Sequence, residues 1–246
     1  MSFACTNATP QYFGARTTAL SGRKVNSMPE PKLRELVQAQ GYVFLRDMAL
    51  PEATAIAQSL GEITADRRSP DPHRPISPQA IDAAKPNTLS SRYGLANFPF
   101  HTDVAHWKRP ADFVLLYCEN PGSGDRPTEL IDARQWRVSD HLGHSLRSSL
   151  WKTGYLSPAF CTVVDYVDGL ANWRYDVGCM RPAGNKSAQL QLEIEVLISS
   201  SKPLTVSWSK QALLVIDNKR MLHARGRAAM PDQDRKLIRM VVGGMQ

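Results

Sequence analysis

The chain has 246 residues, of which 42% are hydrophobic and 22% are charged. This length and composition are typical of one globular domain or two small ones, and they exclude fibrous, collagen-like and strongly disordered proteins. The longest apolar runs, such as Phe113–Cys118, are far shorter than the ~20 residues of a membrane-spanning helix. The first residues lack the basic start and apolar block of a secretory signal, so no membrane partner is expected.

The formal net charge is +7, and the basic residues are scattered in pairs such as Lys219-Arg220. Because no long basic run or basic-aromatic cluster is present, we expect a basic surface or a site for an anionic small molecule, and no nucleic-acid partner. The four cysteines have no short regular spacing, which predicts reduced thiols in a cytoplasmic protein. These cysteines are Cys5, Cys118, Cys161 and Cys179.

Residues 1–28 are polar and irregular and predict a partly ordered N-terminal arm, which is followed by a single domain over 29–246. Two helices are expected early in this domain, over 29–40 and 51–60, because each range begins at a proline and is followed by a glycine. Between them, 42–45 has the apolar character of a short buried strand.

The next region, 65–100, is rich in prolines separated by polar residues. This composition predicts a long loop, which is either a lid or binding loop or a disordered insert. Beyond residue 100, short β-strands dominate, and they are expected over 113–118, 128–131, 204–208, 212–216 and 236–242.

Helices are fewer in this second half of the chain. Asp132 is a candidate N-cap for a helix that begins at 133. A longer helix over 187–200 places Leu190 and Ile194 on one apolar face. Many short strands with few helices predict a mainly β domain, a sandwich or barrel with helices packed outside.

His101 and Asp103 precede the first of these later strands. On an extended segment, residues i and i+2 point to the same face, so the imidazole and the carboxylate would enter one cavity. A polar strand end is the ordinary alternative for such a pair. A second histidine, His223, follows an apolar strand and an Asp-Asn turn, 120 residues (223 − 103) after Asp103. Two histidines and one carboxylate leave three positions open on a metal, which suits non-haem Fe(II) better than tetrahedral zinc.

Two arginines follow on the last expected strand. Arg235, Leu237 and Arg239 share one face there, and buried guanidinium groups require anions such as a carboxylate. The alternative places both arginines in solvent, with Ile238 inside. Thr128 follows a Gly-Ser-Gly turn, and its hydroxyl is a candidate to share a carboxylate with an arginine.

In this order, the features resemble the Fe(II)/2-oxoglutarate-dependent oxygenases of the taurine dioxygenase family, including its clavaminate-synthase-like members. The resemblance covers roughly 97–242, and the helix–strand segment around 30–60 is also similar to the start of the family. One departure is the turn before Thr128, where the family usually has Gly-Gly and this chain has Ser-Gly-Asp-Arg-Pro at 123–127. The matching segments are FHTDVAHW at 100–107, NPGSGDRPTEL at 120–130, LLVIDNKRMLHARG at 213–226 and RKLIRMVV at 235–242.

The resemblance implies roles for individual residues. His101, Asp103 and His223 would ligate Fe(II). Arg235 would pair with the distal carboxylate of the co-substrate 2-oxoglutarate, with the assistance of Thr128.

For the substrate, the resemblance implies that Arg239 holds an acidic group and that Asn97 contacts the substrate. Trp107 and Phe160 are further candidates to line the pocket. Arg239 suggests a small acidic substrate, such as a free amino acid or a derivative of one.

The fold implied by the resemblance is a double-stranded β-helix, the jelly-roll core of cupin-like proteins. The implied reaction is a dioxygenase reaction: O₂ and 2-oxoglutarate are consumed, succinate and CO₂ are released, and an unactivated C–H is hydroxylated or desaturated. Since some relatives that halogenate lack the carboxylate ligand, Asp103 favours hydroxylation or desaturation over halogenation.

Other functions stay open at this point. A cupin-like hydrolase or isomerase would use the same two histidines and Asp103 without O₂, Arg235 or Thr128. A non-catalytic barrel would bind an acidic metabolite, and a nucleic-acid demethylase is suggested by the net charge alone. A homo-oligomer is compatible with the sequence.

Overall fold

The structure is a computed structural model that describes residues 20–21, 30–65, 71–86, 88–154 and 159–245. The expected N-terminal arm, 1–28, therefore lies outside the described residues except for Leu20–Ser21. No helix among the described residues is long and apolar enough to cross a membrane.

The larger sheet has six strands in the order β1-β2-β12-β4-β14-β3. All pairs in it are antiparallel except β1 with β2. Its central strands are almost continuously apolar because both of their faces are covered. The bounds are β1 Leu20–Ser21, β2 Tyr42–Arg46, β12 Leu213–Asp217, β4 Phe113–Asn120, β14 Lys236–Val242 and β3 Arg74–Ile76.

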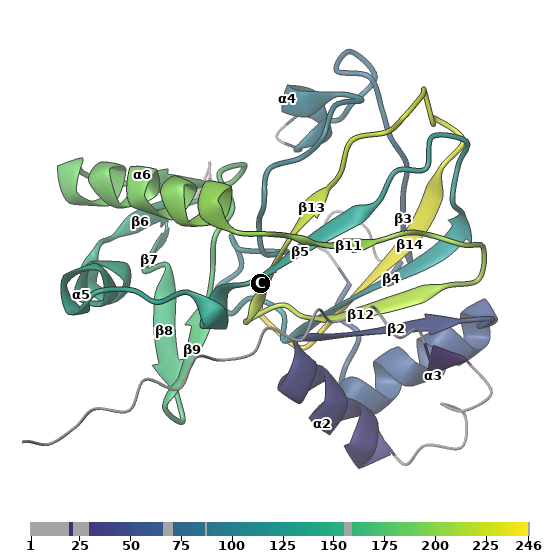
Figure 1. Ribbon diagram of the computed structural model, residues 1–246, viewed down its shortest axis with the longest axis horizontal. Helices are drawn as coiled ribbons and strands as arrows, with labels where there is room; N and C mark the ends of the chain where they lie inside the picture. The colour runs from purple at the N-terminus through teal and green to yellow at the C-terminus, as the bar shows by residue number, and fades with distance from the viewer. Residues whose placement is uncertain (1–19, 22–29, 66–70, 87, 155–158, 246) are drawn as a thin grey trace, which may run out of the picture.

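A second, antiparallel sheet has the order β11-β5-β13 and faces the first (Figure 1). Its strands are β11 Leu204–Val206, β5 Thr128–Asp132 and β13 Met221–Arg225. Side chains of both sheets form one buried cluster between them, in which Leu130 and Val206 meet Leu214 and Val241. The mainly β architecture with flanking helices is therefore confirmed.

Successive side chains of strand β14 point to opposite faces of the larger sheet, so they enter two different hydrophobic clusters. Leu237 and Val241 lie in the cluster between the sheets, whereas Ile238 and Met240 lie in a second cluster beneath the larger sheet. The predicted face of Arg235, Leu237 and Arg239 is thus the interior face, and the alternative with solvent-exposed arginines is wrong.

Two helices cover the outer face of the larger sheet (Figure 1), α2 (Glu30–Gln40) and α3 (Leu50–Leu60). They match the two predicted early helices to within a residue. The prolines at their starts cost no hydrogen bond, because the first N–H groups of a helix have no intrahelical partner.

A third cluster lies beside the two sheets. Leu190 and Ile194 of its longest helix are buried in it, as predicted. Asp132 caps only a short 3₁₀ helix, η1 (Ala133–Gln135), by accepting the Arg134 N–H. The other elements around this cluster are α5 (Asp140–Ser148), α6 (Asn185–Ser200), the sheet of β10 (Met180–Pro182), β6 (Trp151–Thr153) and β7 (Ala159–Cys161), and the hairpin of β8 (Val164–Val167) and β9 (Leu170–Trp173).

The segment 65–100 differs from its prediction as a long loop. It contains the edge strand β3 and a short helix, α4 (Ser90–Tyr93). From the sequence alone, Pro75 in the middle of β3 indicates that this segment is not a strand. An edge strand tolerates proline, however, because one side of it forms no hydrogen bonds with a neighbouring strand. Whether the rest of the segment acts as a lid stays a prediction.

Candidate active site

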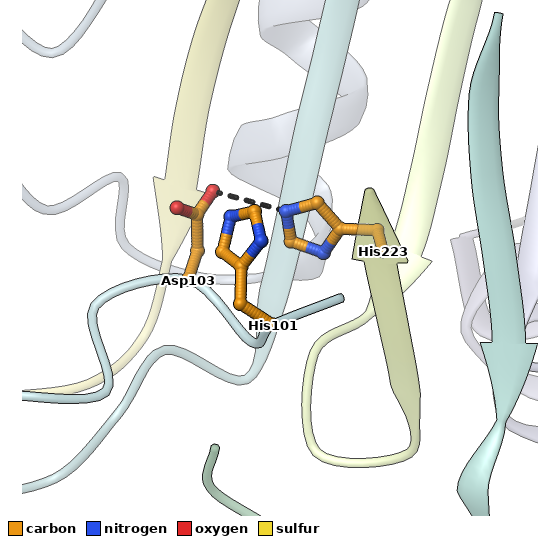
Figure 2. A group of neighbouring side chains, drawn as sticks. All are labelled: His101, Asp103 and His223. Atoms are coloured by element: carbon orange, nitrogen blue, oxygen red, sulfur yellow. Dashed lines mark ion pairs between the residues drawn. The ribbon is translucent and has the colours of Figure 1, made fainter. Parts of the chain in front are cut away.

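His101, Asp103 and His223 converge in the interior, as Figure 2 shows. One ligand atom from each residue lies within 4.8 Å of the other two, and Nε2 of His223 is 3.8 Å from Oδ2 of Asp103. All three side chains belong to residues that are 8% exposed or less. Two histidines and a carboxylate, buried in contact range of one another, form a donor set that can hold one metal ion.

The two histidines are neighbours through a short backbone bridge. The His101 N–H donates to the His223 carbonyl at 3.0 Å, and the His223 N–H donates to the His101 carbonyl at 2.9 Å. The bridge attaches His101 to β13, and the centroids of the two imidazole rings are 4.4 Å apart. Nδ1 of His101 lies 2.9 Å from the Pro99 carbonyl, which can only accept. Nδ1 therefore carries the proton, and Nε2 keeps a lone pair for a metal.

Asp103 reaches this cluster by a route that differs from the prediction. The segment is not an extended strand that carries His101 and Asp103 on one face: Asp103 lies in a turn, and the next residue, Val104, has φ 50°. Such a backbone is rare for a β-branched residue and is found at functional sites held by their surroundings.

Asn218 is the residue that holds this turn, and sequence reasoning did not assign it a role. Its Oδ1 accepts the Asp103 N–H at 2.8 Å, and its Nδ2 donates to the carbonyls of Asp103 at 3.1 Å and Ala111 at 3.0 Å. Asn218 is fully buried. The only signal in the sequence was the Asp-Asn turn after the apolar strand β12.

Arg239 points at the carboxylate of Asp103, with its Nη1 2.7 Å from Oδ1. Burial alone would raise the pKa of Asp103, but Arg239 and then His223 and His101 outweigh burial and lower it to about 2. Burial and the neighbouring His101 lower the pKa of His223 to about 3. At neutral pH the cluster therefore presents a carboxylate and a neutral imidazole, which are the forms that bind a metal.

A second arginine lies near Arg239 and was missed in the sequence because it falls within the expected loop. Arg74 on β3 is directly opposite Arg239 on β14, so both side chains project from the same face of the sheet. Both line a small cavity with Trp107. Arg74 also contributes to the low pKa of Asp103.

Arg235 and Thr128, the predicted co-substrate residues, meet at the ring of Trp208. The guanidinium carbon of Arg235 is 5.9 Å from the ring centroid, and the ring Nε1 donates to Oγ1 of Thr128 at 3.1 Å. Arg235 is 4% exposed, and its Nε has no hydrogen-bond partner among the described residues. Burial lowers the pKa of Arg235 to about 10, so it stays charged at neutral pH. A buried cation with an unused donor fits an anionic ligand such as a carboxylate.

A buried ion pair links this pocket to the loops around it. Nε and Nη2 of Arg126 bind the two oxygens of Asp232 at 2.7 and 2.9 Å, and both side chains are 2% exposed or less. The Asp232 carbonyl accepts the Arg235 N–H at 2.9 Å. Because its partners are 106 residues apart, the pair has no local pattern in the sequence.

The other predicted substrate residues lie in three different places. Asn97 lines an open groove of about 440 Å³ near the Arg126 side chain. Trp107 is 3% exposed and belongs to the core between the sheets, with one edge on the cavity of Arg74 and Arg239. Phe160 is 61% exposed on β7, in a separate sheet, and none of its described contacts reaches the ligand cluster. Their roles as substrate contacts stay predictions.

Residues 6–147 match the sequence profile of the taurine catabolism dioxygenase TauD, TfdA family. This match spans more than half of the chain and includes His101, Asp103 and Thr128. None of the curated proteins searched matches the sequence significantly.

Solved structures share the fold at low sequence identity. An asparagine oxygenase in complex with Fe(II), 3-hydroxyasparagine and succinate gives a TM-score of 0.70 at 18% identity, over 88% of this chain and 80% of that one. The PvcB protein from Pseudomonas aeruginosa gives a TM-score of 0.66 at 16% sequence identity, over 89% of this chain and 82% of that one. The non-heme iron oxygenase OrfP, in complex with Fe and α-ketoglutaric acid, gives a TM-score of 0.68 at 15% sequence identity, over 89% of this chain and 82% of that one.

The matched region carries the His-x-Asp pair, and the rest of the fold adds the second histidine beside it. The two facing sheets match the double-stranded β-helix of these oxygenases. Iron and 2-oxoglutarate are the metal and co-substrate of this family, and the buried His-Asp-His cluster suits the metal. The chain belongs to the TauD/TfdA family of Fe(II)/2-oxoglutarate-dependent oxygenases.

Proposed function

We propose that this protein is a dioxygenase that hydroxylates or desaturates an unactivated C–H of a small acidic substrate, such as a free amino acid or a derivative of one. His101, Asp103 and His223 are proposed as the iron ligands. The observation that carries the proposal is their convergence within 4.8 Å. Arg239 of strand β14 contacts Asp103, and the buried Arg235 directly precedes the same strand.

When bound, iron and 2-oxoglutarate supply the oxidation: O₂ and 2-oxoglutarate are consumed, succinate and CO₂ are released, and one oxygen atom is delivered to the substrate C–H in a hydroxylation. The protein orients and protects these reactants. Asn218 fixes the Asp103 turn, and the Pro99 carbonyl fixes the ring of His101. The apolar packing between the two sheets excludes water around the site.

The proposed site for 2-oxoglutarate is the pocket of Arg235, Thr128 and Trp208. Arg235 offers a planar fork for the distal carboxylate, and the Thr128 hydroxyl can donate to the same group because its oxygen already accepts from Trp208. This division of donors gives each carboxylate oxygen a partner.

An acidic substrate is supported by the positive charges near the carboxylate of Asp103. Arg239 and Arg74 lie on facing positions of β14 and β3, and like charges at such positions repel unless an anion offsets them. Asp103 is one such anion. A substrate carboxylate, sulfonate or phosphonate would be a further anion for these two guanidinium groups.

A free amino acid is supported by two similar structures that hold hydroxylated amino acids. One is an asparagine oxygenase bound to hydroxyasparagine, and the other is an OrfP variant bound to (3S)-hydroxy-L-Arg. These proteins are under 25% identical to this chain, so they suggest a class of compound to test first.

The direct experiment is a screen of free amino acids and small acids for stimulated succinate release by the Fe(II) protein. We expect at least one acidic or zwitterionic compound to raise succinate release and to be oxidised in equal amount. If no compound does so while 2-oxoglutarate still binds, the proposed substrate class is wrong.

A cytoplasmic location and a homo-oligomer also stay predictions. Among the described residues, Cys118, Cys161 and Cys179 are free. Cell fractionation and analytical ultracentrifugation test these two predictions.

A further inference from the structure

The groove of about 440 Å³ has two walls that come from distant parts of the chain. One wall is the segment 95–97, which includes the proposed substrate contact Asn97, and the other is the loop 227–231. Arg126 lines the groove together with both walls. In the sequence, the first wall precedes the segment that carries His101, and the second wall follows the segment that carries His223.

The guanidinium group of Arg126 is fully used inside the protein. Its Nη2 donates to the Leu95 carbonyl at 2.8 Å, and its Nη1 donates to the carbonyls of Gly226 at 3.0 Å and Ala96 at 3.5 Å. Together with the two bonds to Asp232, these contacts occupy all five N–H donors of the side chain. Arg126 therefore has no donor left for a ligand. Its contacts join the 95–97 wall to Gly226 and Asp232, the residues that flank the loop 227–231.

Asp232 connects this group to the 2-oxoglutarate pocket. Both of its carboxylate oxygens bind Arg126, and its backbone carbonyl holds the N–H of Arg235. Its negative charge lies within range of Arg235 and Arg225 as well as Arg126. A single carboxylate thus stabilises three arginines, one of which is the proposed anchor of the co-substrate.

The segment 94–98 has a second attachment that does not involve Asp232. Arg225 donates to the carbonyls of Gly94 and Ala96 and stacks over Phe98, with its guanidinium carbon 3.5 Å from the ring centroid. The Phe98 N–H donates to the Arg225 carbonyl. Because of this attachment, loss of the Arg126–Asp232 pair is expected to loosen the wall without unfolding the domain.

We propose that Arg126 and Asp232 are a positioning pair that couples the proposed 2-oxoglutarate anchor, Arg235, to the groove wall at 95–97. A displacement of Arg235 on co-substrate binding is passed through Asp232 to the Leu95 and Ala96 carbonyls. Ordering of the co-substrate pocket therefore also orders the wall that carries Asn97. The coupling rests on the proposed function, since it requires Arg235 to hold 2-oxoglutarate.

The first test measures co-substrate affinity in the Fe(II) protein without O₂, by titration with 2-oxoglutarate. Asp232→Asn keeps the shape of the side chain and removes its charge, and we expect its dissociation constant to rise fivefold or more. The matched control is Asp125→Asn. Asp125 is exposed, is adjacent to Arg126, and has φ 46°, a conformation that Asn tolerates; its dissociation constant should stay within twofold of wild type.

The second test measures the coupling itself, by amide hydrogen exchange of a peptide that covers 94–98. In the wild-type Fe(II) protein, we expect saturating 2-oxoglutarate to slow exchange in this peptide. In Asp232→Asn at saturating 2-oxoglutarate, this slowing should be lost, although the ligand is bound. A residue with only a structural role would change exchange in the free protein and leave the response to the ligand intact.

Arg126→Lys serves as a second variant in case Asp232→Asn does not fold. It keeps the charge, but a single ammonium group cannot reach five acceptors, so the same loss of response is expected. An unchanged affinity, or an exchange response equal to that of wild type, overturns the proposal. If Arg235→Gln leaves 2-oxoglutarate affinity unchanged, the proposed anchor fails. If Arg235→Gln weakens binding and Asp232→Asn does not, only the coupling fails.

Discussion

Asn218 and Asp103 exchange two hydrogen bonds across 115 residues of chain. The amide of Asn218 accepts the Asp103 N–H and donates to the Asp103 carbonyl, and it reaches the Ala111 carbonyl as well. The turn that contains Asp103 and Val104 (φ 50°) is thereby held by the residue that directly follows strand β12. The side-chain amide of Asn218 therefore positions Asp103, the proposed carboxylate ligand.

Replacement of this amide is the first prediction. Asn218→Ala removes the partner of three backbone groups, the Asp103 N–H and the carbonyls of Asp103 and Ala111. Each of them that stays unsatisfied costs about 1–3 kcal/mol. We expect the free energy of unfolding to fall by about 2–4 kcal/mol and iron affinity to fall by about 10- to 100-fold. Urea denaturation and iron titration measure the two effects. An Asn218→Ala variant with wild-type iron affinity would contradict the assigned role.

The proposed co-substrate anchor, Arg235, gives a second prediction. In Arg235→Gln, the distal carboxylate of 2-oxoglutarate enters a buried pocket without its cation, at a cost of about 2–5 kcal/mol. The 2-oxoglutarate requirement should rise by roughly 30-fold or more, with iron content unchanged. Arg137→Gln is the control, because Arg137 is exposed on a loop. A wild-type requirement in Arg235→Gln would move the anchor elsewhere.

Gly122 lies against the same arginine and gives a third prediction. A Cβ at Gly122 would lie 2.7 Å from Cβ and 3.1 Å from Cα of Arg235, and Gly122 has φ 80°. Gly122→Ala should therefore weaken 2-oxoglutarate binding and lower stability by about 1–3 kcal/mol. The matched control is Gly169→Ala, because Gly169 has φ 76° and nothing within 4 Å of a Cβ. Both variants should lose stability, and only Gly122→Ala should also lose co-substrate affinity, as measured by titration.

Arg74 provides a fourth prediction, about the substrate side. Arg74→Gln removes one of the two facing guanidinium groups, so the KM of the substrate found by the succinate screen should rise about tenfold, in line with about 1.4 kcal/mol. The affinity for 2-oxoglutarate should not change. Arg74→Lys keeps the charge and should restore part of the affinity. Equal KM values for Arg74→Gln and wild type would show that the anion binds elsewhere.

Much of the scaffold could be predicted from the sequence because its signals are local. The prolines at 29 and 51 and the glycines at 41 and 61 bound two helices that the structure contains. Strand β14 matches its predicted range. Its alternation predicts that Leu237 and Arg239 share the interior face, because a one-residue shift would place them outside.

The missed features depend on contacts between distant segments. Asn218 holds the Asp103 turn, strand β3 pairs with the edge of β14, and Asp232 binds Arg126. In each case the two partners are far apart in the sequence, so no local pattern predicts the contact. The sequence also left a cupin-like hydrolase, an isomerase and a non-catalytic barrel open. Membership of the TauD/TfdA family decides for the oxygenase.

The most direct test of the account is an anaerobic titration of 2-oxoglutarate into the Fe(II) protein, followed by visible absorption. We predict a weak charge-transfer band in the wild-type protein and in His144→Ala, whose histidine is exposed on α5. Asp103→Ala and His223→Ala should give no such band. No band in the wild-type protein, or a full band in either ligand variant, would contradict the proposed iron site.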